Sequence, residues 1–526
     1  ASVSKTEGRG FESCHSCQIL FHQQAELMSA ELTFAQFAPR RTGLGGFLAA
    51  PTVREGLLLG LALAVLACLP VLVAVYPQMV DYPAHLARYY VMLERGDNAF
   101  LQRYYDFDWK WSGNLGADLL VQPLVPLFGL EAAGRIIAGL VPLLTALGIL
   151  TVEWTLRRRI GLGSLLALCF VWSPSLILGF LNFGLAQAAA LFAFAAWVRL
   201  EGKAWLPLLF VPVGVLVWLL HVSGWGMLGI LVFGYEWHRH KGLAAFLAPW
   251  PLFLPFLSLV LGDNPSSLPS YGPRVWVYKL AIWKQAMRDG VYWIDHASLL
   301  VIAAVLAGSL LLRRIDGRLG WAAVILLLGS IAVPRHIFGG DLADARMIYS
   351  GLLVGCLALS WQVPRVVLWL APALFLGRLA ITTDNWQRGS AETERLLAAV
   401  DHLPQGARVA NLVVTNSGVW GYNAQEHIGG YAVLRKNVLI NAHFAVPGVH
   451  MIRPREGGPG FRDPSQRLLW RQGKPIDLSD WAPAKGMDWL WYVGQREPDA
   501  LPAGAVVVYR APGTLVARLA KVPGDS

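Results

Sequence analysis

Long apolar runs separated by short polar or basic turns fill the first three quarters of the chain. A helix needs about 20 mainly apolar residues to cross the hydrocarbon core of a bilayer. Runs of this kind predict spanning helices near 56–75, 132–154, 162–180, 183–199, 205–221, 223–237, 243–261, 298–312, 319–334, 347–362 and 366–381. The pattern therefore indicates a polytopic α-helical membrane protein with about 11 transmembrane helices.

Basic clusters at the ends of these runs orient the helices. The groups at 40–41, 157–159 and 313–314 all become cytoplasmic if the stretch 117–130 does not span. Cytoplasmic loops carry an excess of Lys and Arg, which supports this arrangement. The stretch 117–130 is short and contains two prolines, so we expect a helix lying on the membrane surface.

The same orientation divides the chain into three parts. Residues 1–54 are expected to form a cytoplasmic N-terminal extension, and 55–384 a transmembrane domain whose first outer loop is 78–131. Residues 385–526 lack membrane-like runs and contain short β-type segments near 408–415, 489–493 and 505–509. An odd number of spans places this soluble α/β or mostly-β domain outside, which in a bacterium is the periplasm. We thus expect a multi-pass protein of the bacterial inner (plasma) membrane.

Composition supports this class. Hydrophobic residues make up 55% of the 526 positions and charged residues only 15%, against about 25% in soluble domains. Intrinsic disorder is excluded because it requires low hydrophobicity and high charge density. The net charge of +10 does not indicate nucleic-acid binding, since the basic residues end apolar runs and form no basic face interleaved with aromatics. Cys14 and Cys17 have no second pair of ligands at zinc-finger spacing.

Three acidic residues of the first outer loop are the candidate catalytic groups. Asp81 follows the first spanning helix at the outer interface, where a carboxylate costs free energy unless it is paired or faces a wet cavity. The alternative interpretation is that Asp81 has a structural role as the N-cap of a helix that starts near Pro83. Asp106 and Asp108 would face one way on a strand, which suits general-base work or a divalent cation. The alternative for them is an ordinary aromatic-rich interfacial loop.

Cations on the outer side are candidates for binding phosphate. The positive-inside rule does not explain them, and Arg suits bidentate contact with phosphate. For any single one of these cations, the alternative interpretation is that it anchors the protein to ordinary phospholipid headgroups. The set consists of Arg88, Lys110, Lys279, Lys284, Arg335, His336 and Arg346. His85 is a further candidate as a phosphate contact or proton carrier, with simple solvation as its alternative.

Residues 55–200 combine several features: Val-Asp-Tyr-Pro-Ala-His at 80–85, the acidic cluster at 106–108, Gly-Leu-Glu-Ala-Ala-Gly-Arg-Ile-Ile-Ala-Gly-Leu at 129–140, the basic turn at 157–159 and Trp-Ser-Pro at 172–174. In these features the chain resembles the GT-C-fold integral-membrane glycosyltransferases. The odd helix number and the outer C-terminal domain also match. Two motifs of relatives are absent: Tyr82 follows Asp81 where an Asp-Glu pair is found, and there is no Trp-Trp-Asp-type acceptor motif.

The resemblance implies transfer of a sugar from a polyprenyl-phosphate donor to an acceptor hydroxyl on the periplasmic face, in envelope glycan or glycolipid synthesis. Asp81 would then be the base, and outer Arg or Lys residues would hold the donor phosphate. A divalent cation (Mg²⁺ or Mn²⁺) at Asp81 with Asp106 or Asp108 is compatible with the family. The acceptor would be a glycan, a lipid or a protein. Two other functions stay open: a transporter or flippase of a lipid-linked sugar, and a non-catalytic scaffold of an envelope complex.

Overall fold

The computed structural model describes residues 48–261, 269–337, 340–445, 450–456, 461 and 464–520. Its described residues fall into two units, one of 48–50 with 364–366 and the other of the remaining described residues. Within the first unit, the backbone N–H of Arg365 donates to the carbonyl of Ala49 at 3.0 Å. Most of the predicted N-terminal extension, with Cys14 and Cys17, lies outside the described residues.

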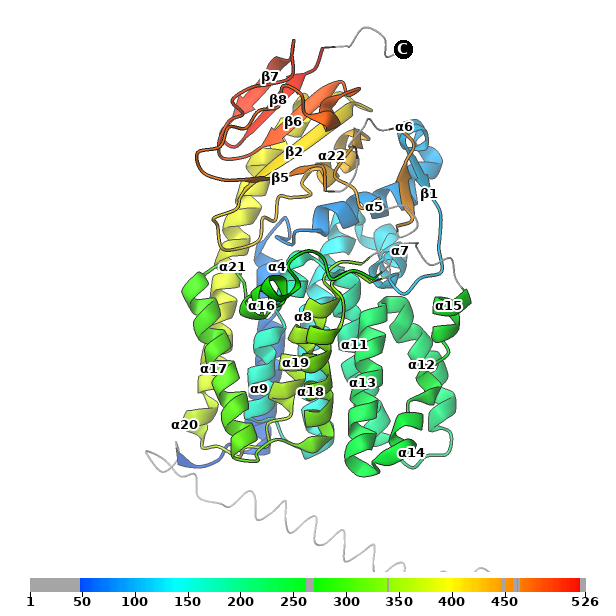
Figure 1. Cartoon of the computed structure of the whole chain (residues 1–526), viewed down its shortest axis with the longest axis vertical. Coiled ribbons are helices and arrows are strands. Elements are labelled where there is room, and N and C mark those ends of the chain that lie inside the picture. The colour runs from blue at the N-terminus through cyan, green and yellow to red at the C-terminus, as the bar shows by residue number, and fades with distance from the viewer. Residues whose placement is uncertain are drawn as a thin grey trace, which may run out of the picture. The chain divides into compact units, whose positions relative to one another are not determined.

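The second unit is mainly helical, and its longer helices run side by side (Figure 1). The helices of the first half are α3 (Val53–Leu66), α4 (Leu69–Val73), α5 (Tyr82–Glu94), α6 (Ala99–Tyr104), α7 (Gly116–Phe128), α8 (Leu130–Arg157), α9 (Leu162–Ala167), α10 (Pro174–Leu178), α11 (Leu181–Arg199), α12 (Leu206–Leu220) and α13 (Val222–Arg239). Those of the second half are α14 (Gly242–Leu247), α15 (Phe256–Leu261), α16 (Val275–Lys284), α17 (Tyr292–Leu311), α18 (Gly317–Ala332), α19 (Ala343–Leu357), α20 (Arg365–Leu368), α21 (Leu370–Leu397) and α22 (Gly429–Lys436). Short 3₁₀ turns are η1 (Arg95–Asp97), η2 (Leu168–Phe170), η3 (Trp250–Leu252), η4 (Ala398–His402) and η5 (Ala482–Ala484).

Among the described residues, five helical stretches are long and apolar enough to cross a membrane by length and composition. They are Val53–Val73, Leu130–Arg157, Leu181–Arg199, Tyr292–Leu311 and Arg365–His402. Other apolar helices at predicted spans, such as Leu206–Leu220 and Gly317–Ala332, are shorter. The chain therefore has the helices of a multi-pass membrane protein, while the number eleven stays a prediction.

Local signals explain the helix boundaries. α3 begins at a capping box in which Thr52 and Glu55 each accept from the other's backbone N–H. The break predicted near Asn182 is confirmed, because Gly179 adopts φ +96° between α10 and α11. The break predicted near Val222 is also confirmed: His221 is extended, and its Nδ1 accepts from the backbone N–H of Ser223 at the start of α13.

The prediction of one continuous span over 243–261 is wrong. This stretch forms three short pieces, α14, η3 and α15. Pro249, Pro251 and Pro255 lie between or within these pieces. Proline has no N–H to donate, and its ring clashes with the carbonyl four residues earlier, so a helix cannot continue through the group.

The stretch 117–130 forms a helix, α7, as expected. α7 is seen nearly end-on in Figure 1 while α11 and α13 run vertically, so α7 crosses the ends of these helices. The side-chain oxygen of Asn182 accepts from the N–H of Ala117 at 2.6 Å, which fixes the first turn of α7 to the start of α11. Its placement on a membrane surface stays a prediction.

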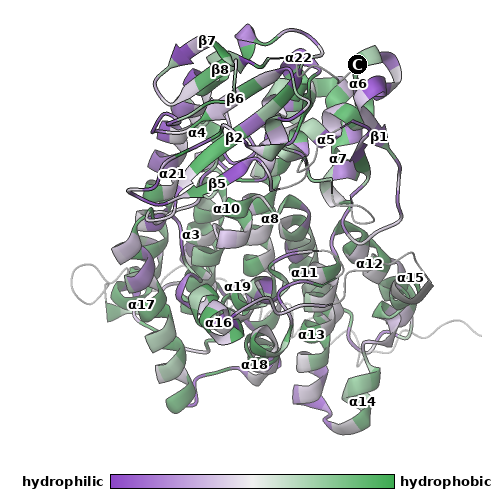
Figure 2. Ribbon diagram, turned by 45° about the horizontal axis from the view of Figure 1, so that its top comes forward, coloured by the Kyte–Doolittle hydropathy of each residue, from purple (hydrophilic) through white to green (hydrophobic). Residues whose placement is uncertain are grey.

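The C-terminal region forms a mixed β-sheet beyond one end of the helices (Figure 1), and Figure 2 shows more hydrophilic residues there than along the helices. Its strands are β2 (Arg408–Asn416), β3 (Leu439–Ile440), β5 (Arg467–Trp470), β6 (Trp489–Val493), β7 (Val506–Ala511) and β8 (Thr514–Arg518). The order is β3-β2-β6-β8-β7, with β5 also paired to β2. β2 pairs in parallel with β3, β5 and β6, whereas β8 is antiparallel to β6 and β7. The three predicted strand segments are confirmed nearly residue for residue.

Several features of the described residues hold the C-terminal region to the helices. α21 runs without a break across the predicted domain boundary at 384/385. The first outer loop contributes β1 (Tyr105–Phe107), which pairs antiparallel with β4 (Ile452–Pro454). α22 packs on α5, where Gly430 lies so close to Pro83 that a Cβ at position 430 would clash with the Pro83 carbonyl. The two regions therefore enclose a common space.

Candidate functional site

A cavity of about 1750 Å³ lies where the first outer loop, the helix ends and the C-terminal region meet. Drug-sized ligands occupy pockets of about 300–1000 Å³, so this cavity has room for a larger molecule. Polar lining residues include Asp81, Arg88, Lys110, Arg288 and Arg346. The sequence candidates Asp81, His85, Arg88, Lys110 and Arg346 are thus brought together, although they come from separate segments.

Asp81 occupies the N-cap position of α5 but does not cap it. Its backbone is in the right-handed helical region, and its side chain makes no capping hydrogen bond. The carboxyl group lines the cavity, and the side chain keeps 16% of its surface exposed. Gly179 makes room for it, because a Cβ at position 179 would lie 2.9 Å from the Asp81 Cβ. The capping alternative is therefore not what holds this carboxylate in place.

His85 and Arg88 lie on the following turns of α5, and both are buried. His85 Nε2 lies 3.1 Å from the Gly179 carbonyl, a contact that braces the turn beside Asp81. Burial, with the charge of Arg88, holds the pKa of His85 well below its ordinary value. Arg88 donates to the Asp118 carboxylate at 2.8 Å, so its charge is already neutralised by α7.

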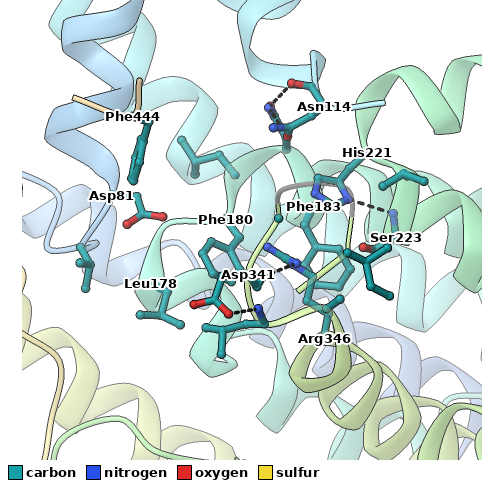
Figure 3. Close-up of a pocket in the computed structure, with 18 of the residues that line it drawn as sticks. Asp81, Asn114, Leu178, Phe180, Phe183, His221, Ser223, Asp341, Arg346 and Phe444 are labelled. Carbon is teal, nitrogen blue, oxygen red and sulfur yellow. Dashed lines mark hydrogen bonds between the residues drawn. The ribbon is translucent and has the colours of Figure 1, made fainter. Parts of the chain in front are cut away.

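Arg346, in the first turn of α19, carries a charge without a close carboxylate. Its Nη1 donates to the backbone carbonyl of Asp341 at 2.8 Å, and its guanidinium lies 4.3 Å from the ring centre of Phe180. Its Nε is buried without a hydrogen-bond partner. The Asp341 carboxylate instead pairs with Arg335 at 2.6 Å. Figure 3 shows Asp81 and Arg346 on opposite sides of Phe180.

No ion pair involving Arg346 occurs within the described ranges of the chain. Asp341 and Asp81 act on Arg346 without a close ion pair, and a cavity that keeps a desolvated guanidinium in this state is suited to an anionic ligand. Arg288 is similar, because it lies between the rings of Tyr422 and Trp420 at 4.2 and 5.1 Å and donates to the Gly421 carbonyl.

The cavity also has an apolar part. Met227 and Ile230 of α13, Leu326 of α18 and Met347 of α19 all line it. Met347 is the residue after Arg346, so the apolar part adjoins the uncompensated cation. This arrangement suits an amphiphile whose anionic group lies near Arg346 and whose apolar portion extends between the helices.

Asp106 and Asp108 do not belong to the residues that line this cavity. Both lie at the surface and pair with arginines of the β4 segment, Asp106 with Arg455 at 2.7 Å and Asp108 with Arg453. The hydrogen bond from Arg455 lowers the pKa of Asp106 below its ordinary value. These carboxylates join the first outer loop to the C-terminal region, and we do not assign them to the site.

Lys279 is not available for a phosphate. Its buried ammonium donates to the Asp344 carboxylate at 2.6 Å and to the carbonyls of Ser330 and Val333 at 2.8 and 2.6 Å. All three N–H donors are therefore used within the fold. Lys110, by contrast, is exposed and lines the cavity.

The donor set does not favour a metal centre at the predicted positions. Within the part of the chain that the structure describes, no three His, Cys, Asp or Glu side chains gather closely enough to hold a metal ion. Asp81 faces the cavity whereas Asp108 forms a surface ion pair, so the two do not form a shared site. We derive no metal-dependent step.

The C-terminal region contributes lining residues that sequence reasoning missed. They include Glu426, His427, Phe444, His450 and Arg467. Glu426 and Arg467 pair with each other at 3.0 Å. The one signal that could have found them is the grouping of His427, His443 and His450 within 24 residues, but no known motif accompanies it. Two aromatic residues of the same region also lie here, since Tyr422 lines the cavity and Trp420 packs on Arg288.

Comparison with known proteins places the chain in no family. No protein-family model matches it, and no curated protein matches its sequence. Among solved structures, it is similar to ArnT from Cupriavidus metallidurans bound to undecaprenyl phosphate, with a TM-score of 0.47 and 12% identity over 88% of this chain and 97% of that one. A likeness this distant assigns neither a family nor a function.

Proposed function

We propose that the protein is a membrane glycosyltransferase that moves a sugar from a polyprenyl-phosphate donor to an acceptor hydroxyl at the periplasmic face. The observation that carries the proposal is the pairing, in one large cavity, of the Asp81 carboxylate with the uncompensated Arg346 guanidinium beside an apolar lining. The amphiphilic donor matches this lining, because it joins a charged phosphate to a long apolar chain.

The proposed reaction needs a base and an anion-binding group. Asp81 takes the proton of the acceptor hydroxyl while its oxygen attacks the anomeric carbon of the sugar. The bond between that carbon and the phosphate oxygen breaks, and its electron pair leaves with polyprenyl phosphate. Arg346 hydrogen-bonds the departing phosphate, whose negative charge increases as the bond breaks. The donor itself supplies the driving force, so no nucleotide is required.

The test is transfer of radiolabelled sugar from a panel of undecaprenyl-phosphate-linked donors in membranes that contain the full chain. Asp81→Asn should abolish transfer while expression and folding are retained, because the amide cannot accept the proton. Asp480→Asn is the matched control, since Asp480 is an exposed carboxylate paired with Lys485 at 2.6 Å. Equal transfer by wild type and Asp81→Asn would remove Asp81 from the mechanism.

The same membranes separate transfer from transport. If wild type moves the lipid-linked sugar between leaflets without forming a glycosylated product, the protein is a flippase. If it does neither, and an envelope complex requires the protein but is unaffected by Asp81→Asn, the scaffold function is favoured.

A further inference from the structure

A histidine of the C-terminal region faces Asp81 across the cavity. His427 lies just before α22, lines the cavity and is 2% exposed. Its Nε2 lies 3.9 Å from the Asp81 Oδ1. The two residues are far apart in sequence, so only the packing of the C-terminal region on α5 brings them together.

The other ring nitrogen of His427 is held by the backbone. Nδ1 lies 3.0 Å from the carbonyl oxygen of Ala442. A carbonyl only accepts hydrogen bonds, so Nδ1 must carry a proton. The Gln466 amide nitrogen Nε2 lies 3.3 Å from Nδ1, and rotation of this amide by 180° would bring its oxygen to the same place, where it would accept from the ring N–H. With Nδ1 protonated, the neutral ring presents the lone pair of Nε2 toward Asp81.

The packing around His427 fixes its ring and its distance from Asp81. The ring centre lies 4.6 Å from that of Phe444. The N–H of Gly430 donates to the His427 carbonyl at 2.9 Å, and Gly430 itself lies tightly against Pro83, two residues beyond Asp81. The close contact between Gly430 and Pro83 thus fixes the backbone near His427 against the backbone near Asp81.

We propose that Asp81 and His427 act as one proton-carrying pair, in which His427 Nε2 accepts the proton that Asp81 removes from the acceptor hydroxyl. This inference rests on the proposed function. The acceptor O–H bond breaks as its oxygen bonds to the sugar, and the electron pair of the broken sugar–phosphate bond leaves with the phosphate. Because 3.9 Å exceeds hydrogen-bond distance, the proton passes from Asp81 to Nε2 through one intervening water. The Asp81 carboxylate is restored, and the imidazolium then releases its proton to water. His427 acts through Asp81 and does not touch the sugar.

Several charged or titratable groups surround this pair and influence its titration. On the elements packed against His427 they are Asp81, His85, Arg88, Glu426, His443 and His450. Burial lowers the pKa of His443 and of His450 to about 3, so both are neutral near pH 7. The Asp81 carboxylate lies 3.9 Å from the Nε2 atom of His427. Asp81→Asn removes this carboxylate and therefore tests the pair directly.

The first experiment needs no substrate. The full chain, labelled with ¹⁵N-histidine and solubilised in detergent, is titrated by NMR, and the signals absent from His427→Asn identify His427 among the 12 histidines. We expect the ¹⁵N signals of the neutral ring to show the proton on Nδ1, and the Nε2 signal to change in Asp81→Asn. A neutral ring without a proton on Nδ1, or an Nε2 signal that Asp81→Asn leaves unchanged, would overturn the proposed pair.

The second experiment tests the proton step. His427→Asn keeps an amide N–H in the position of Nδ1 and removes only the Nε2 group. We expect kcat for sugar transfer to fall about 30-fold with the donor KM within about twofold, and the acidic limb of the kcat–pH profile in the imidazole range to disappear. His402→Asn is the matched control, because His402 stacks on Tyr509 away from the cavity.

The two experiments separate the possible failures. Wild-type transfer with an unchanged kcat in His427→Asn would overturn the proton role of His427 while the proposed function stands. Absence of transfer by wild type, together with the expected NMR shift, would overturn the proposed function and leave the pair established.

Discussion

Replacement of Arg346 by Gln tests the anion-binding part of the site most directly. The guanidinium has five N–H donors, of which one donates to the Asp341 carbonyl, and Nε has no partner. Two charge-assisted hydrogen bonds to a phosphate each contribute about 1.5–3 kcal/mol. After allowance for the weaker bonds that Gln can form, we expect a loss of about 3 kcal/mol in transition-state stabilisation, roughly 150-fold in kcat/KM.

The division of this loss between kcat and KM is also predicted. The phosphate of the bound donor is a diester with one negative charge, whereas the departing polyprenyl phosphate is a monoester that carries more. Arg346 therefore binds the transition state more strongly than the substrate, and kcat should fall more than KM rises. Arg346→Lys keeps the charge but loses the planar guanidinium that can donate two parallel hydrogen bonds. We expect kcat/KM to fall about tenfold.

The assay is steady-state transfer with the donor varied, in membranes with matched amounts of folded protein. Arg388→Gln is the control, since Arg388 forms an exposed ion pair with Asp384 on α21. A change of less than about threefold in kcat/KM for Arg346→Gln would refute the assignment. A change confined to KM would show that Arg346 binds the donor without stabilising the departure of the phosphate.

Three further predictions concern residues outside this contact. Asp108→Asn should leave sugar transfer within about twofold of wild type, because Asp108 lies in a surface ion pair outside the cavity; transfer assays with the same donor check this. Lys279→Met should lower the free energy of unfolding by about 3–5 kcal/mol, because it leaves the buried Asp344 carboxylate uncompensated; thermal unfolding in detergent measures the loss. Burial raises the pKa of Asp289 to about 6, so the folded state binds a proton more tightly than the unfolded state. Stability should therefore decrease by up to about 2–3 kcal/mol as the pH rises from 4 to 7, and Asp289→Asn should flatten that part of the stability–pH curve.

Each of these has an outcome that would contradict it. Transfer reduced tenfold or more in Asp108→Asn would restore the catalytic role that its sequence position suggests. Unchanged unfolding of Lys279→Met would show that the ammonium is not needed to neutralise Asp344. A stability curve that rises from pH 4 to 7 in wild type but not in Asp289→Asn would mean that the carboxylate is stabilised in its ionised form.

The sequence by itself determined the class of fold and much of its outline. Apolar length predicts helices because an unsatisfied backbone in a bilayer is costly, and the breaks near Asn182 and Val222 follow from local residues such as Gly179 and His221. The strand segments of the C-terminal region were also predictable, because alternation and turn residues are local signals. Asp81 could be singled out because its position beside an apolar helix makes an unsatisfied carboxylate costly.

Only the tertiary structure decided which charges remain available. The sequence suggested Arg88, Lys279 and Arg346 equally, but partners distant in sequence neutralise the first two, with Asp118 for Arg88 and Asp344 for Lys279. The approach of His427 to Asp81 likewise depends on the packing of α22 on α5. Hydropathy and spacing report on neighbours along the chain, whereas the electrostatics of a cavity depend on contacts between segments hundreds of residues apart.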